Sequence, residues 1–139
     1  MKELIKTYMI GERPEISNSE KMFLELKDLF TEEKELFIVF HLDSKNNVIS
    51  REIVSIGTIN KCVLSPSTIF RNSIKLNANS ILLAHNHPSG DLNPSYEDKK
   101  VTNELKKAGE ILQIEVLDHI IFNNEKYKSI NEEQKRDTI

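Results

Sequence analysis

Two histidines and an aspartate between residues 85 and 98 have the types and the spacing of metal ligands. His85 and His87 are two residues apart at the end of the apolar run SILLAH, and Asp98 lies near the start of a helical pattern. Because alternate side chains of a strand leave the same face, both imidazoles can reach one point. Three protein ligands leave a tetrahedral zinc ion one open position for water. The pattern predicts a catalytic site with one zinc ion per chain.

Asp98 also continues an apolar stripe of the predicted helix, which consists of Val101, Leu105, Ala108 and Leu112. A buried carboxylate is costly unless a cation or several donors compensate it. The alternative is that Ser95 and Asp98 form only a helix capping box, and that His85 and His87 are hydrogen-bonded histidines at a strand end. These separate roles leave the inward direction of Asp98 unexplained, so the sequence favours the metal site.

Hydrolysis at such a site also needs a proton acceptor within hydrogen-bond reach of the attacking water. Glu35 lies where a predicted helix gives way to the first strand, and it is our candidate. Position alone does not separate it from Glu32, Glu33 or Glu52, and each of these is also explained as a solvated surface charge.

The stretch HNHPSGDLNPSYED closely resembles the signature of the JAMM (MPN-plus) metalloprotease fold, in the form found in the RadC family. That signature is His-x-His, seven residues, then Ser-x-x-Asp. The segments ELFIVFHLDSKNNVI, SIGTIN and LDHIIF resemble further parts of the family, so the resemblance covers about residues 18 to 131. It implies that His85, His87 and Asp98 hold zinc. It also implies that Ser95 donates a hydrogen bond to the reacting oxygen and that Glu35 is the general acid and base.

The resemblance implies a zinc-dependent hydrolase that cleaves an amide, peptide or isopeptide bond in a protein or peptide substrate. The alternative is a non-catalytic accessory or binding module in DNA repair or recombination, as the family's historical name suggests. Full-length relatives carry an amino-terminal helix-hairpin-helix segment associated with DNA, which this sequence lacks. The formal net charge of −3 gives no global attraction to nucleic acid, so we expect no direct DNA binding without a partner.

Other metal enzymes fit the pattern less well. The residues of HNH nucleases are dispersed over a hairpin and a helix, whereas His85, Asn86 and His87 are contiguous. Zinc deaminases pair His-x-Glu with Pro-Cys-x-x-Cys, which a chain with one cysteine cannot supply. Two histidines and one carboxylate also suit non-haem iron, so zinc is an inference. Pro66, Ser67 and Thr68 stand where the family usually has Pro-Arg-Glu, so this sequence has no arginine at that position to contact a substrate.

The hydrophobic pattern predicts the elements that position these residues. A capping box of Ser17 and Glu20 precedes the first helical pattern, and Ser65 before Pro66 begins the second. The predicted order is helix 18–30, a hairpin of strands 36–43 and 48–57, helix 65–77, strand 80–85, helix 95–112 and strand 114–122. This order predicts an α/β fold with one mixed sheet flanked by helices. The resemblance implies the JAB/MPN (cytidine deaminase-like) architecture.

Three further residues have no assigned role in the chemistry. Asp118 and His119 stand together on the last predicted strand, where they could support the ligands from behind or form a buried hydrogen-bonded pair. His41 is interpreted as structural.

The composition is that of one globular domain, with 139 residues of which 38% are apolar and 29% charged. We assign residues 1–17 to an amino-terminal arm, 18–131 to the domain and 132–139 to a charged tail.

The lone Cys62 cannot form an intramolecular disulfide, and we expect it to be buried. Since no apolar run suits a signal peptide or a membrane span, we expect a cytoplasmic protein. The hairpin edge is available to pair with another copy, so an oligomer is compatible with the sequence.

Overall fold

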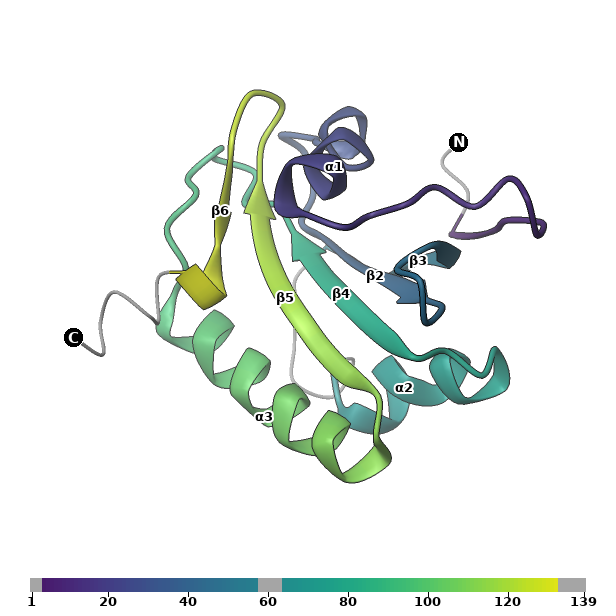
Figure 1. Ribbon diagram of the computed structural model, residues 1–139. Helices are drawn as coiled ribbons and strands as arrows, with labels where there is room; N and C mark the ends of the chain where they lie inside the picture. Colours follow the sequence, from purple (N-terminus) through teal and green to yellow (C-terminus); the bar gives the residue numbers. More distant parts are fainter. Residues whose placement is uncertain (1–3, 58–63, 133–139) are drawn as a thin grey trace.

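The structure of the chain is a computed structural model, and it describes residues 4–57 and 64–132. These residues form one mixed six-stranded sheet with helices on both faces (Figure 1). The strands in spatial order are β1 (Ile5–Thr7), β3 (Val48–Ile56), β2 (Leu36–Leu42), β4 (Ser80–His85), β5 (Glu115–Phe122) and β6 (Tyr127–Ser129). β4 and β5 are parallel, and the other neighbouring pairs are antiparallel. The predicted mixed sheet flanked by helices is confirmed.

The two central strands consist almost entirely of apolar side chains. β2 has the sequence LFIVFHL and β4 has SILLAH, and every residue of both strands is buried. Such runs suit strands that are covered on both faces, because alternate side chains then need apolar partners on each side. The register of the two strands places His85, the last residue of β4, opposite Phe37 near the start of β2.

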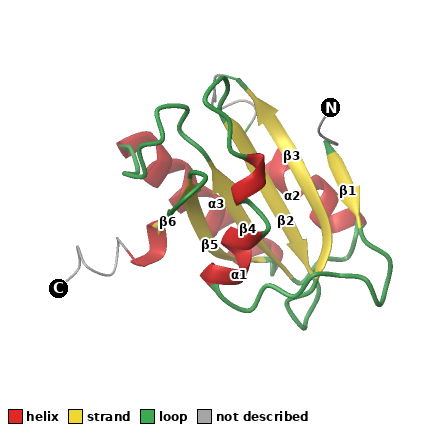
Figure 2. Ribbon diagram, turned by 90° about the horizontal axis from the view of Figure 1, so that it is seen from above, coloured by secondary structure: helices red, strands yellow, loops and turns green. Residues whose placement is uncertain are grey.

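The helices form one layer on each face of the sheet (Figure 2). One layer contains α1 (Ser19–Leu24) and the 3-10 helix η1 (Lys27–Leu29), and the other contains α2 (Pro66–Lys75) and α3 (Tyr96–Leu112).

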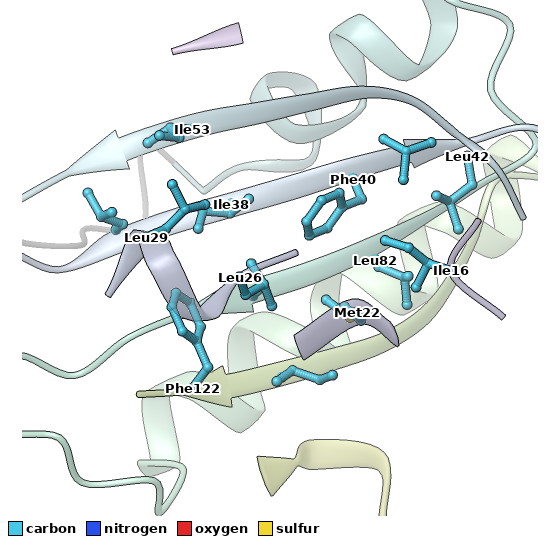
Figure 3. Close-up of a cluster of buried hydrophobic side chains, with 14 residues drawn as sticks. Ile16, Met22, Leu26, Leu29, Ile38, Phe40, Leu42, Ile53, Leu82 and Phe122 are labelled. Atoms are coloured by element: carbon cyan, nitrogen blue, oxygen red, sulfur yellow. The ribbon is translucent and has the colours of Figure 1, made fainter. Parts of the chain in front are cut away.

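The two faces of β4 contact different layers. Leu82 belongs to the core cluster that Met22 and Leu26 complete on the α1 side (Figure 3). Leu83 belongs to the second cluster, with Leu105 of α3. Side chains at odd positions of β4 therefore face α3, and those at even positions face α1 and η1.

Two short strands were not predicted. The segment expected as an arm contributes β1, in which Thr7 pairs with Ser50 of β3. It also contributes Ile16 to the core. The hairpin edge that was available for another copy is thus covered along part of β3. β6 likewise pairs with β5, for example between Ser129 and Ile120. Strands of three residues are too short to show a period of two, so pairing alone defines them.

The first predicted helix is wrong in its start and its length. Its N-cap is Asn18, whose Oδ1 accepts a hydrogen bond of 2.8 Å from the backbone N–H of Lys21, so the capping box of Ser17 and Glu20 is not formed. Asn and Ser are comparable N-caps, and the helix begins one residue later than predicted. α1 ends at Leu24, and the 3-10 turn of η1 replaces the rest of the predicted helix.

The predicted stripe of α3 is correct in its middle and wrong at its end. Val101 and Leu105 are buried, but Leu112 is 43% exposed and Gly109 takes its place against the sheet. A side chain at Gly109 would put its Cβ 2.4 Å from the backbone oxygen of Ile114. The last turn of α3 therefore approaches the chain before β5 more closely than any larger residue allows.

Three further predictions concern membrane spans, Cys62 and the charged tail. No helix in residues 4–57 and 64–132 is long and apolar enough to cross a membrane. Cys62 lies outside the described residues, as does the charged tail beyond Glu132.

Candidate metal centre

The structure brings the three predicted ligands together at the end of β4. His85 Nε2 and His87 Nε2 are 3.1 Å apart. Asp98 Oδ2 lies 3.2 Å from His87 Nε2, and Asp98 Oδ1 lies 3.3 Å from His85 Nε2. Tetrahedral zinc with bonds of about 2.0–2.1 Å places its ligand atoms about 3.4 Å apart. The two Nε2 atoms and the Asp98 oxygen nearest to each of them therefore have the spacing of ligand atoms around one zinc ion.

The hydrogen bond of His87 determines which of its ring nitrogens is available. Its Nδ1 atom lies 2.9 Å from the backbone oxygen of Asp91. A carbonyl oxygen only accepts, so Nδ1 carries the hydrogen and donates it. In the neutral imidazole, Nε2 then carries a lone pair and faces Asp98 and His85.

A longer chain of hydrogen bonds likewise determines that the Nε2 atom of His85 carries its lone pair. Thr102 donates its hydroxyl hydrogen to the backbone oxygen of Asp98, at 2.7 Å. His119 Nδ1 lies 2.6 Å from this hydroxyl and must therefore be the donor to it. Burial and the neighbouring His85 hold the pKa of His119 well below its ordinary value, so its Nε2 is an acceptor. His85 Nδ1, 2.7 Å away, donates to it, which leaves the lone pair of His85 on Nε2.

When both imidazoles are neutral, the site thus collects two imidazole lone pairs and a carboxylate with no hydrogen donor between them. Such a set is repulsive unless a positive charge lies at its centre. Without a metal, a proton on His87 can supply this charge: Nε2 then donates to Asp98, and this hydrogen bond raises the pKa of His87 against the effect of burial. Burial opposes ionisation of Asp98, but His85 and His87 outweigh it and hold the pKa of the carboxyl well below its usual range. The donor set therefore fits a divalent cation such as zinc.

The capping box of Ser95 and Asp98 is compatible with the predicted ligand role of Asp98. Ser95 is the N-cap of α3, and its Oγ accepts a hydrogen bond of 3.0 Å from the backbone N–H of Asp98. The backbone N–H of Ser95 donates in return to Asp98 Oδ2, at 2.8 Å. These reciprocal bonds hold the carboxylate so that both oxygens face the histidines. The Ser95 hydroxyl accepts in this box, and its own hydrogen is available to a ligand.

Glu35 is the glutamate that the fold places beside the histidines. One of its carboxylate oxygens and one ring nitrogen each of His85 and His87 lie within 4.8 Å of one another, close enough to bind a metal ion together. Glu32 and Glu33 are exposed, and Glu52 lies elsewhere, 3.0 Å from His41 Nε2. Glu35 is thus distinguished from the three glutamates that the sequence could not separate from it.

Two carboxylates therefore flank the imidazoles. Asp98 has an oxygen within 3.3 Å of each Nε2 atom, and a carboxylate oxygen of Glu35 lies within 4.8 Å of a ring nitrogen of each histidine. Asp98 has the spacing of a direct ligand, and Glu35 is a second carboxylate at the same site.

A protein-family model described as a RadC-like JAB domain matches residues 16–135. The chain belongs to this family. The RadC-like JAB domain is 52% identical over 101 residues to a UPF0758 protein of Chlorobium chlorochromatii, a match that covers 73% of the chain and 46% of the relative. A UPF0758 protein of Aquifex aeolicus is 42% identical over 132 residues, which are 94% of the chain and 57% of the relative. The chain spans about half the length of these relatives.

In this RadC-like JAB domain, Asp118 and His119 have different partners. His119 contacts the ligand His85, whereas the Asp118 carboxylate accepts hydrogen bonds from the Ser129 hydroxyl, at 2.7 and 2.9 Å. Asp118 and His119 are therefore not a side-chain pair, and only His119 supports the site. His41 is fully buried between Ser73 and Glu52, which agrees with a structural role.

Sequence reasoning missed two residues near the site. Thr102 completes the hydrogen-bond chain to His119, and its signal was its position one helical turn after Asp98. Asn86 contacts the segment that carries Glu35, and its signal was its place between His85 and His87, on the opposite face of the strand.

Proposed function

We propose that this RadC-like JAB domain is a zinc-dependent hydrolase that cleaves an amide, peptide or isopeptide bond in a protein or peptide substrate. One observation carries the proposal. The Nε2 atoms of His85 and His87 lie 3.1 Å apart, each lies 3.2 to 3.3 Å from one carboxylate oxygen of Asp98, and the carboxylate of Glu35 lies beside them. Three ligands with a second carboxylate nearby are typical of catalytic rather than structural zinc sites.

His85, His87 and Asp98 would hold the ion through their two Nε2 atoms and the carboxylate. Bound zinc would supply Lewis-acid activation, which lowers the pKa of water to about 7. The same ligand set also accommodates iron, so zinc is the part of this proposal that metal analysis decides.

Glu35 would act on protons. In our proposal its carboxylate accepts a proton from the attacking water and returns it to the leaving amine, which makes it general base and then general acid. Its distance from the histidines supports this role, because it is near enough to reach a water molecule between them. Ser95 would donate its hydroxyl hydrogen to the oxygen of the scissile carbonyl as negative charge develops there.

The test compares the zinc-loaded protein, its Glu35→Gln variant and the metal-free protein on a peptide library that includes lysine-branched peptides. Mass spectrometry detects new amino termini. We expect cleavages that require both zinc and Glu35, while the variant retains the metal. If the zinc-loaded protein and the variant give identical products, the catalytic role has to be withdrawn.

The binding-module alternative predicts the opposite outcome of this comparison, with full metal content and no Glu35-dependent cleavage. The formal net charge of −3 gives no support to autonomous DNA binding. Gel shifts with duplex and single-stranded DNA at low and moderate salt test that part separately.

A further inference from the structure

Asn86 stands between the two histidines but serves the opposite face of the sheet. Even positions of β4 face α1 and η1, and Asn86 continues this alternation one residue past the strand. Its side chain is completely buried on the face away from the ligand nitrogens. A buried amide needs hydrogen-bond partners, because a buried donor or acceptor without one loses its bonds to water and gains nothing in return.

The partners of Asn86 all lie in the segment that carries Glu35. Its Oδ1 accepts a hydrogen bond of 2.8 Å from the backbone N–H of Leu36. Its Nδ2 donates to the backbone oxygens of Thr31, at 2.9 Å, and Lys34, at 3.0 Å. Both hydrogens and the oxygen of the amide are therefore used. These bonds hold the backbone on either side of Glu35, at residues 34 and 36.

A fourth hydrogen bond completes the support of this segment. The backbone oxygen of Glu35 accepts a hydrogen bond of 2.8 Å from the N–H of Gly57, beyond the end of β3. The backbone of Glu35 is thus attached to β3 on one side and, through Asn86, to the end of β4 on the other. Since His85 and His87 adjoin Asn86 in the chain, the same tripeptide locates the ligands and the carboxylate.

We propose that Asn86 is a positioning residue that determines where the Glu35 carboxylate stands relative to the metal ligands; this inference rests on the proposed function. No common substitute reproduces its three bonds. Aspartate has no hydrogens to donate, and it would face two carbonyl oxygens with a negative charge. Serine is too short to reach three backbone groups that span residues 31 to 36, and glutamine is one methylene longer.

The first test needs neither metal nor substrate. Amide hydrogen exchange is measured by NMR in the metal-free protein and in its Asn86→Ser and Asn131→Ala variants. Asn131 is a matched control, since its Nδ2 donates to the Leu117 oxygen at 2.8 Å beside a cavity of about 570 Å³ near the last turns of α3. We expect Asn86→Ser to speed exchange of the Leu36 amide by about tenfold and Asn131→Ala to leave it unchanged.

If Asn86→Ser does not fold, the unaltered protein still decides this point. An amide of Leu36 that exchanges as fast as one in an unstructured peptide would overturn the hydrogen bond on which the proposal depends. Strong protection of that amide supports it.

The second test uses Co²⁺ as the probe at the same site. Visible absorption is followed against pH in the loaded protein and in the Glu35→Gln, Asn86→Ser and Asn131→Ala variants. We expect Asn86→Ser to bind one Co²⁺ per chain with the pH profile of Glu35→Gln, and Asn131→Ala to keep the profile of the unaltered protein. A purely structural role of Asn86 would lower stability without moving this profile.

The outcomes separate the two proposals. If no Co²⁺ binds to the unaltered protein, the metal-dependent function fails, while the exchange of Leu36 still reports the positioning contact. If Glu35→Gln alters the profile and a folded Asn86→Ser does not, the positioning role is overturned and the proposed function stands. If Glu35→Gln itself has no effect, both the base and its positioning residue are withdrawn.

Discussion

The Nε2 atom of His119 lies 2.7 Å from the Nδ1 atom of His85, and both rings are buried. Because Thr102 accepts from the other nitrogen of His119, this contact assigns the hydrogen of His85 to Nδ1 and its lone pair to Nε2. Outer partners of this kind orient metal-binding histidines and increase their basicity.

Replacement of His119 by alanine should therefore weaken metal binding without removing a ligand. We expect an affinity loss of about 10-fold to 100-fold, the usual cost of losing such a partner. Competition with a chromophoric chelator measures it. Thr102→Ser retains the hydroxyl and should stay close to the unaltered protein, and an unchanged affinity in His119→Ala would contradict the deduced hydrogen-bond chain.

Two variants separate the cap from the ligand at the start of α3. Asp98→Asn keeps an oxygen that can accept from the Ser95 N–H but removes the negative charge, so we expect loss of stoichiometric zinc with helix content retained. Ser95→Ala removes the cap and should cost about 1 kcal/mol of stability while zinc is retained. Metal content and circular dichroism distinguish these results. Full zinc occupancy in Asp98→Asn would remove Asp98 from the ligand set.

The raised pKa of His87 predicts a pH dependence in the metal-free protein. The hydrogen bond to Asp98 is the main cause, and burial opposes it. A group whose pKa is raised on folding contributes its full stabilisation below its ordinary pKa of 6.5, and loses it as pH rises through the folded value.

The comparison that tests this dependence is between the protein and its His87→Gln variant, both in excess chelator. The difference in their free energies of unfolding, from urea titrations, should be larger near about pH 6 than near about pH 9. A difference that is the same at both pH values would contradict the interaction.

The close packing at Gly109 predicts a loss of stability on substitution that is independent of the metal site. A Cβ there would lie 2.4 Å from the backbone oxygen of Ile114, so α3 or the following turn must move to accept alanine. We expect Gly109→Ala to destabilise the protein by about 1–3 kcal/mol, in spite of the better helix propensity of alanine. Glu110→Ala, on the exposed neighbour, should remain within about 0.5 kcal/mol. Equal stability of the two variants would argue against this close approach.

Sequence patterns were sufficient where a feature is local. His85, His87 and Asp98 lie within one strand end, one turn and one helix start, so the strand and helix periods place their side chains. The central strands could also be predicted from the sequence, because β2 and β4 are nearly continuous apolar runs. The stripe of α3 was predicted through Leu105 and failed at Leu112, where a close approach by Gly109 replaces a packed side chain.

Only the tertiary structure decided the rest, because those features depend on groups far apart in the chain. β1 and β6 exist through pairing and carry no period of their own. Glu35 is distinguished from its neighbours by its place beside His85 and His87. The backbone next to it is held by Asn86, which lies 50 residues after Leu36. The lone pair of His85 is assigned by His119, 34 residues later. The residue types determine which atoms can bind a cation. The packing of β4 against β2, β5 and α3 determines how those atoms are oriented. Hydrogen bonds between distant segments produce no periodic pattern in the sequence, so the sequence alone does not predict this orientation.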